Sequence, residues 1–158
     1  MTGNNDPPWV KKFRQSVERM EELAGKGNWY DFNQPYLSQL KKTGRGNCVA
    51  WSKLMIEIAT DAGLETIVVV FEDARTKWGS DWPHQICVIV DKDNDVWCQD
   101  NIRVYRLKRI RGRLSRKKIV AAIKQAAQKS AKMFQFKGGA RILTMSQRKS
   151  LRGRGRII

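Results

Sequence analysis

The sequence contains few of the residues that build metal sites and disulfide frameworks. It has one histidine and three cysteines in 158 residues, and the cysteines are Cys48, Cys87 and Cys98. These positions do not match the spacing of a zinc motif, and an odd number of thiols argues against a disulfide framework. We therefore expect free thiols, no metal and no other cofactor, and a reducing, cytoplasmic-type location.

Long apolar runs are also missing. No segment approaches the roughly 20 apolar residues that a membrane-spanning helix needs, and residues 1–6 lack the apolar stretch of a secretory signal. Hydrophobic residues still make up 41% of the chain, and six residues are Trp. A chain of this length and composition can bury a core. The composition predicts a folded domain with no membrane partner and leaves its oligomeric state open.

Acidic residues are absent from the last third of the chain. Residues 1–100 carry 12 Lys and Arg against 15 Asp and Glu, whereas residues 101–158 carry 19 Lys and Arg and no acidic residue. Such a field attracts nucleic acid or an acidic protein, although a basic surface can also serve solubility alone. The Arg-Gly end resembles segments that bind RNA or DNA through phosphates. The candidate anion-binding residues are Arg109, Arg111, Arg113, Arg116, Lys117, Arg152, Arg154 and Arg156.

Apolar periodicity predicts an α+β fold in which N-terminal helices pack on an antiparallel sheet. Residues 28–46 are expected to form an aromatic-anchored loop. The expected helices cover about 7–24, 47–62 and a basic segment from Ser115, and the expected strands cover 67–71, 85–90, 96–100 and about 102–107. We assign residues 1–136 to a single domain that includes the basic C-terminal helix. Residues 137–158 are expected to form a loosely ordered, Arg- and Gly-rich basic tail.

Cys48 falls on the first turn of the second predicted helix, which Asn47 is expected to cap. Unpaired backbone N–H groups and the helix dipole stabilise a thiolate at such a position. The N–H of the cysteine itself can also bind an oxyanion there. The alternative interpretation is a small buried thiol, which is common for cysteine.

His84 is the only histidine, and it lies where the Trp82-Pro83 segment enters a strand. By itself a lone histidine is more often structural than catalytic. If Val90 pairs with Val96 in the predicted hairpin, His84 and Asp100 share a face of the ribbon. Asp100 can then accept the ring proton and orient the imidazole. A register slip of one residue would separate the pair, and Asp100 would then be a strand-end turn residue.

These motifs follow one another in an order that is typical of a known enzyme group. The segments are Gly46-Asn47-Cys48, Ala62-Gly63-Leu64, His84-Gln85-Ile86-Cys87-Val88 and Val96-Trp97-Cys98-Gln99-Asp100-Asn101. Over residues 36–105 the chain resembles the transglutaminase-like superfamily, and it is most similar to the bacterial transglutaminase-like cysteine proteinases. The resemblance implies a papain-like core in which a helix bearing the cysteine packs on an antiparallel sheet bearing histidine and aspartate.

The function that this implies is acyl transfer by a thiol peptidase or amidase acting on a peptide or amide substrate. Cys48 would be the nucleophile, His84 the base and Asp100 the orienting group, and transamidation stays open. Candidates for oxyanion or substrate contacts are Asn47, Gln39, Trp51 and Trp82, with Tyr36 behind Gln39.

A second interpretation is a binding protein with the same scaffold and a silent triad. Its basic half would engage nucleic acid or an anionic partner. The small size and basic tail also suit a phage or viral accessory protein, in which case the location would be the host cytoplasm or the virion.

Overall fold

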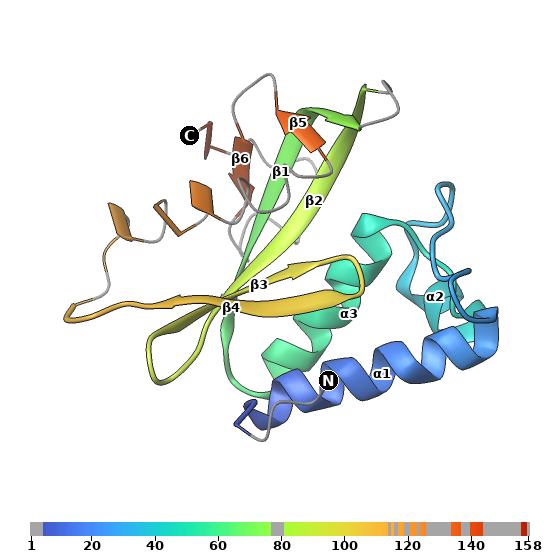
Figure 1. Cartoon of the computed structure of the whole chain (residues 1–158), viewed down its shortest axis with the longest axis horizontal. Helices are drawn as coiled ribbons and strands as arrows, with labels where there is room; N and C mark the ends of the chain where they lie inside the picture. Colours follow the sequence, from blue (N-terminus) through green and yellow to red (C-terminus); the bar gives the residue numbers. More distant parts are fainter. Residues whose placement is uncertain are drawn as a thin grey trace.

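A computed structural model describes residues 5–76, 81–113, 115, 117–118, 121–122, 124–125, 134–136, 140–143 and 156–157. For residues 71–76, 81–83, 134–136, 140–143 and 156–157 it describes the backbone alone. Helices come first in the chain and strands follow (Figure 1). The elements are α1 (Pro8–Ala24), α2 (Leu37–Thr43), α3 (Cys48–Asp61), β1 (Glu65–Thr76), β2 (Asp81–Val90), β3 (Asp95–Asp100), β4 (Arg103–Arg109), β5 (Phe134–Phe136), β6 (Ala140–Leu143) and β7 (Arg156–Ile157).

The strands form one antiparallel sheet in the order β4-β3-β2-β1-β6-β7, with β5 also paired to β1. The hairpin of β2 and β3 pairs Val90 with Val96, which confirms the predicted register. The fold is therefore a mixed α+β class with an antiparallel sheet, as the periodicity predicted. Within the described part of the chain, no helix is both long and apolar enough to cross a membrane.

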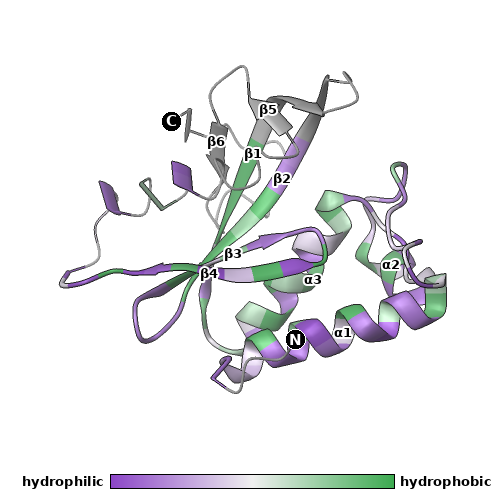
Figure 2. Ribbon diagram, viewed as in Figure 1, coloured by the Kyte–Doolittle hydropathy of each residue, from purple (hydrophilic) through white to green (hydrophobic). Residues whose placement is uncertain are grey.

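Both faces of the sheet are covered. Val68 and Cys87 pack with the buried residues of α1, α2 and α3, among them Trp51, which is fully buried. The next residues along the same strands, Val69 and Ile86, belong to a second buried cluster on the other face. Alternate side chains of a strand point to opposite faces, so burial on both faces explains the nearly continuous apolar runs of β1 and β2. Figure 2 shows α1 striped with apolar and hydrophilic residues, as expected for a helix with one buried face.

Helix α3 begins and ends as predicted. The Asn47 side-chain oxygen accepts hydrogen bonds from the N–H groups of Val49 and Ala50, at 3.0 and 3.3 Å. Gly63 follows the C-terminal end with φ of +70°, a conformation that glycine adopts without a steric penalty. Local signals therefore fix both ends of the helix that carries Cys48.

The loop predicted for residues 28–46 is wrong in part, because it contains helix α2. Leu40 anchors α2 in the core with no exposed surface, and Gly44 ends it with φ of +74°, donating its N–H to Leu40 O at 2.8 Å. A seven-residue helix makes about two turns, which is too short for apolar periodicity to appear in the sequence.

The basic tail predicted for residues 137–158 also needs correction, because its described part adds strands to the sheet. β6 pairs with β1, and β7 pairs with β6. An exposed strand edge presents unpaired N–H and C=O groups, so another segment can join it. The start of the basic helix is confirmed by Ser115, whose hydroxyl accepts the N–H of Lys118 at 3.3 Å.

Two glycines give a matched test of how α1 and α2 fit together. A Cβ added at Gly44 would lie 2.0 Å from the Met20 carbonyl oxygen, whereas a Cβ at Gly27 meets nothing within 4 Å, although both residues have positive φ. We expect Gly27→Ala to lower the free energy of unfolding by about 1 kcal/mol, through backbone strain alone. Gly44→Ala should cost about 3 kcal/mol, since the backbone must also move. Chemical denaturation measures both, and equal losses would contradict the close contact.

Candidate active site

Cys48 is the first residue of α3 and is 7% exposed. The first N–H groups of a helix have no partner within the helix, and the dipole makes that end positive. The Cys48 sulfur therefore belongs to the positive end of the helix. Cys87 and Cys98 have no exposed surface, and both belong to the buried clusters. Cys48 is thus the one of the three thiols that retains access to solvent.

His84 and Asp100 meet across the β2–β3 ribbon. The distance from His84 Nε2 to Asp100 Oδ1 is 2.8 Å, and the two side chains are 5% and 14% exposed. Cys48 also raises the pKa of the His84 imidazole, through a side-chain hydrogen-bond effect and through its charge, so the two side chains are near each other. Because Nε2 is engaged with the carboxylate, Nδ1 is the ring nitrogen that remains for the sulfur. The structure therefore brings Cys48, His84 and Asp100 together in the order that the sequence predicted.

The electrostatics of this cluster favour a charged imidazole. Burial lowers the pKa of His84, but the hydrogen bond that its ring donates to Asp100, the hydrogen-bond effect of Cys48 and the electrostatic effects of both groups outweigh burial. The net effect raises the pKa of His84 from 6.5 to about 9. At neutral pH the ring is then an imidazolium between a carboxylate and the sulfur, the charge state that a thiolate nucleophile needs beside it.

Tyr30 also lies at this site, although the sequence identified it only as an aromatic residue of the loop. Burial, the charge of Cys48 and the charge of Asp100, in that order, raise the pKa of Tyr30 to about 12. Tyr30 is therefore near enough to Cys48 and Asp100 for their charges to raise its pKa, and its hydroxyl is protonated at neutral pH. A parallel bridge between Tyr30 and Gly46 brings the two segments together. Such a bridge joins residues far apart in sequence and leaves no local motif.

The predicted oxyanion and substrate residues are placed differently. Asn47 is occupied as the cap of α3, and its amide Nδ2 donates to the Phe32 carbonyl at 3.1 Å. Trp51 has no exposed surface, and its indole N–H donates to the Gly46 carbonyl at 3.1 Å, so it supports the loop and cannot touch a substrate. This corrects both residues to supporting roles, because their polar atoms are already bonded inside the protein.

Two further candidates are exposed residues at α2, and the side chain of a third is outside the described part of the chain. Gln39 is an exposed residue of α2, and its backbone carbonyl accepts the Thr43 hydroxyl at 2.8 Å. Tyr36 is 61% exposed at the start of α2. The side chain of Trp82 lies outside the described residues.

The basic candidates divide in the same way. Arg109 binds the buried Asp95 carboxylate through Nε and Nη2, at 2.8 and 2.9 Å. This corrects the assignment of Arg109 as an anion-binding residue, because its guanidinium group already binds a carboxylate of the protein. The same interaction lowers the pKa of Asp95. Arg111, Arg113 and Lys117 are exposed. Arg116, Arg152 and Arg154, and the side chain of Arg156, lie outside the described residues.

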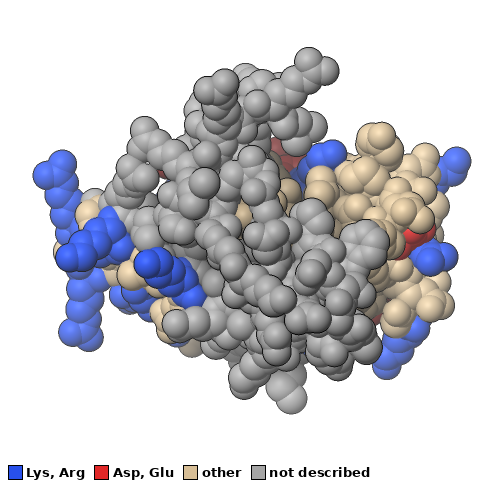
Figure 3. All heavy atoms as spheres, turned by 90° about the horizontal axis from the view of Figure 1, so that it is seen from above, with Lys and Arg blue, Asp and Glu red and all other residues tan. Residues whose placement is uncertain are grey.

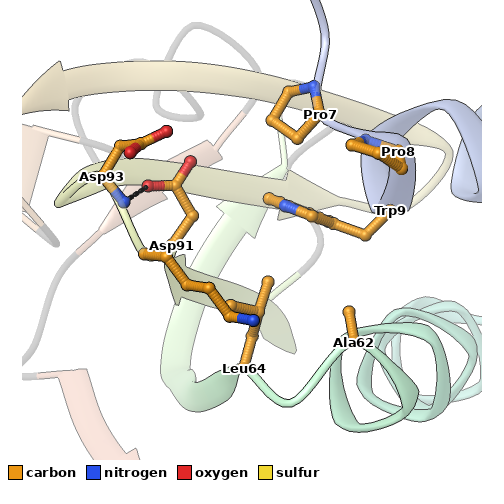
Figure 4. A pocket seen from close by; sticks show the side chains of 8 residues that line it. Pro7, Pro8, Trp9, Ala62, Leu64, Asp91 and Asp93 are labelled. Atoms are coloured by element: carbon orange, nitrogen blue, oxygen red, sulfur yellow. Dashed lines mark hydrogen bonds between the residues drawn. The ribbon is translucent and has the colours of Figure 1, made fainter.

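Two cavities lie away from the triad. One of about 270 Å³ is bordered by the start of α1 and the β2–β3 turn (Figure 4). The other, of about 420 Å³, is lined by residues of α1, by Ile102 and by β4. Neither is lined by Cys48, His84 or Asp100. In the first, the Asp91 carboxylate already accepts N–H groups of Asp93 and Trp97.

The charge state of the triad can be measured directly, because His84 is the only imidazole in the protein. Its NMR titration should have a midpoint near pH 9. Asp100→Asn removes the carboxylate charge, so we expect the midpoint to fall by about 1 unit or more. Asp61→Asn is the matched control, because Asp61 is an exposed acid of α3 paired with Lys12. A midpoint that Asp100→Asn leaves unchanged would contradict the His84–Asp100 interaction.

Comparison with known proteins adds no further assignment. No family model, no curated protein and no solved structure matches the chain. What this site can do therefore follows from its own geometry.

Proposed function

We propose that the protein is a cysteine-nucleophile acyl-transfer enzyme, a thiol peptidase or amidase. The observation that supports this most directly is the position of His84. Its Nε2 lies 2.8 Å from Asp100 Oδ1, and Cys48, at the start of α3, is near enough to raise the pKa of the ring. A nucleophile, a base and a group that orients the base are the parts that such a reaction requires.

The proposed reaction has two steps. The Cys48 sulfur attacks the carbonyl carbon of an amide, and the carbonyl oxygen takes the negative charge next to the N–H groups of the first turn of α3. The C–N bond then breaks, and the His84 imidazolium gives its proton to the departing amine. In the second step His84 accepts a proton from water, which attacks the thioester. The C–S bond breaks and releases a carboxylic acid and the thiolate. An amine in place of water would give a new amide.

The resemblance to the transglutaminase-like superfamily supports the same proposal. A helix that begins at Cys48 and a β2–β3 ribbon that carries His84 and Asp100 are what a papain-like core requires. We include in the proposal a reducing, cytoplasmic-type setting, because the three cysteines are free thiols.

Thiol labelling tests the proposal. Iodoacetamide applied to the folded protein at neutral pH should modify Cys48 first, because Cys87 and Cys98 have no exposed surface. Peptide mapping by mass spectrometry identifies the modified residue. Cys48→Ala should abolish this labelling and all turnover of activated ester or amide substrates, while thermal unfolding stays within a few degrees of wild type.

Cys87→Ala is the control that should retain both labelling and turnover. If the probe labels Cys87 or Cys98 of the folded protein in place of Cys48, the nucleophile is misassigned. If Cys48→Ala retains turnover, the acyl-transfer proposal fails.

A second candidate function is the binding of anionic polymers. It is favoured by the exposed Arg111, Arg113 and Lys117, which follow β4. Figure 3 shows blue Lys and Arg side chains at both ends of the molecule, with a denser group at the left end. Contacts of this kind position a phosphate backbone without reading its sequence. The scaffold would then act as a nucleic-acid-binding or acidic-protein-binding module.

Salt dependence separates specific phosphate contacts from a merely soluble surface. We expect the affinity for a single-stranded oligonucleotide to fall steeply between 50 and 200 mM salt, with a slope that reflects the number of contacts. Replacing Arg111 and Arg113 by Ser should reduce that slope by about 1 to 2. Replacing Lys11 and Arg19, exposed residues of α1, removes the same charge elsewhere. Equal effects of the two pairs, measured by fluorescence anisotropy, would mean that only net charge matters.

A further inference from the structure

Exposed aromatic residues are concentrated in one segment of the described chain. The large hydrophobic residues with substantial exposure are Leu23 at 52%, Tyr30 at 37%, Phe32 at 44% and Tyr36 at 61%. Three of these four lie within residues 30–36, just before α2. Scattered exposed apolar residues are ordinary, whereas a cluster of them marks a surface that meets a ligand or a partner.

This segment is fastened to the residues that precede the nucleophile. Gly46 N–H donates to the Trp29 carbonyl at 3.1 Å, and Asp31 N–H donates to the Gly46 carbonyl at 3.2 Å. The Asn47 side chain donates to the Phe32 carbonyl at 3.1 Å and caps α3 with its oxygen. The same two residues, Gly46 and Asn47, therefore hold the aromatic segment and position the start of the helix. These hydrogen bonds therefore fix the position of the Tyr30 and Phe32 segment relative to Cys48.

The rings extend in a chain from the core to the surface. Trp29 contacts the fully buried Trp51 edge to face, at 6.2 Å between ring centroids. Trp29 contacts Tyr30 in the same way at 5.5 Å, and Tyr30 contacts Phe32 at 6.3 Å. Such pairs are favourable geometries for aromatic rings. Phe32 therefore packs against Tyr30, whose pKa is raised by the charges of Cys48 and Asp100.

We infer that Tyr30 and Phe32 form the subsite that receives a large apolar or aromatic side chain of the acyl group attacked by Cys48. This inference rests on the proposed acyl-transfer function and names its substrate class. An apolar side chain gains by covering rings that water now touches. An acidic side chain is disfavoured, because the carboxylates of Asp31 and Asp100 lie beside the same segment. Tyr36 is left outside the subsite, because its ring faces the Lys53 amine at 5.8 Å.

Two irreversible probes test this selectivity without knowledge of the natural substrate. They are N-acetyl-phenylalanyl chloromethyl ketone and N-acetyl-aspartyl chloromethyl ketone, from which the Cys48 sulfur displaces chloride to form a C–S bond. The readout is the second-order rate constant for modification of Cys48, followed by intact-protein mass spectrometry. We expect the phenylalanyl probe to react at least about 10-fold faster, since filling an apolar subsite discriminates by about 10- to 200-fold.

Variants of Phe32 assign the preference to the subsite. Phe32→Ala should lower the ratio of the two rate constants to about 2 or less, and Phe32→Leu should retain a ratio between these values. The Phe32→Leu variant also covers the case in which Phe32→Ala disturbs the fold. Leu23→Ala is the matched control at another exposed apolar residue, and it should keep the wild-type ratio. Iodoacetamide has no side chain to place in the subsite, so its rate with Cys48 should stay within about 2-fold in every variant.

The outcomes separate failure of the inference from failure of the proposed function. If iodoacetamide modifies Cys48 but the two ketones react equally with the wild-type protein, the apolar subsite is wrong and the nucleophile stands. If none of the reagents modifies Cys48, the proposed function fails first. If Phe32→Ala leaves the ratio unchanged and weakens oligonucleotide binding instead, the rings stack on bases and the subsite is overturned.

Discussion

The hydrogen bond between His84 Nε2 and Asp100 Oδ1 is the interaction on which the rest of the site depends. It fixes the ring so that Nδ1 remains for Cys48. The bond exists only because β2 and β3 pair with Val90 opposite Val96. A shift of one residue would turn every side chain of one strand to the other face. The register of the sheet, usually a matter of packing, here also decides whether His84 and Asp100 meet.

Burial and charge oppose each other at this site. A buried imidazolium is unfavourable, and Asp100 and Cys48 stabilise it by their charges and hydrogen bonds. Because the folded pKa of about 9 lies above the unfolded value near 6.5, the cluster stabilises the fold fully below about pH 6.5. That contribution is lost as the pH rises through about 9. The cluster of Cys48, His84 and Asp100 therefore contributes most to the stability of the fold when His84 is an imidazolium. The imidazolium is also the charge state that the proposed acyl transfer uses.

The sequence predicted the parts that depend on local signals and on alternation. Asn47 and Gly63 set the ends of α3 by their own chemistry, and the turn at 91–95 set the β2–β3 register. It did not predict α2, which is too short to show a period. It also missed the place of Tyr30, because a bridge between distant segments leaves no spacing to find. The sequence also did not predict the pairing of Arg109 with Asp95. In a segment with many basic residues, the sequence does not show which of them pairs with an acidic residue in the fold.

The side chain of Asn47 places a constraint of its own on the end of α3 that carries Cys48. Its oxygen holds the helix, and its nitrogen holds the carbonyl of Phe32. An aspartate has the same shape and caps a helix as well, but it cannot donate a proton to that carbonyl. Two oxygens would then face each other, and a negative charge would stand beside the sulfur. The Asn47 amide thus links the N-terminal end of α3 to the neighbouring loop that contains Phe32. An aspartate at this position would break that link and leave the overall fold unchanged.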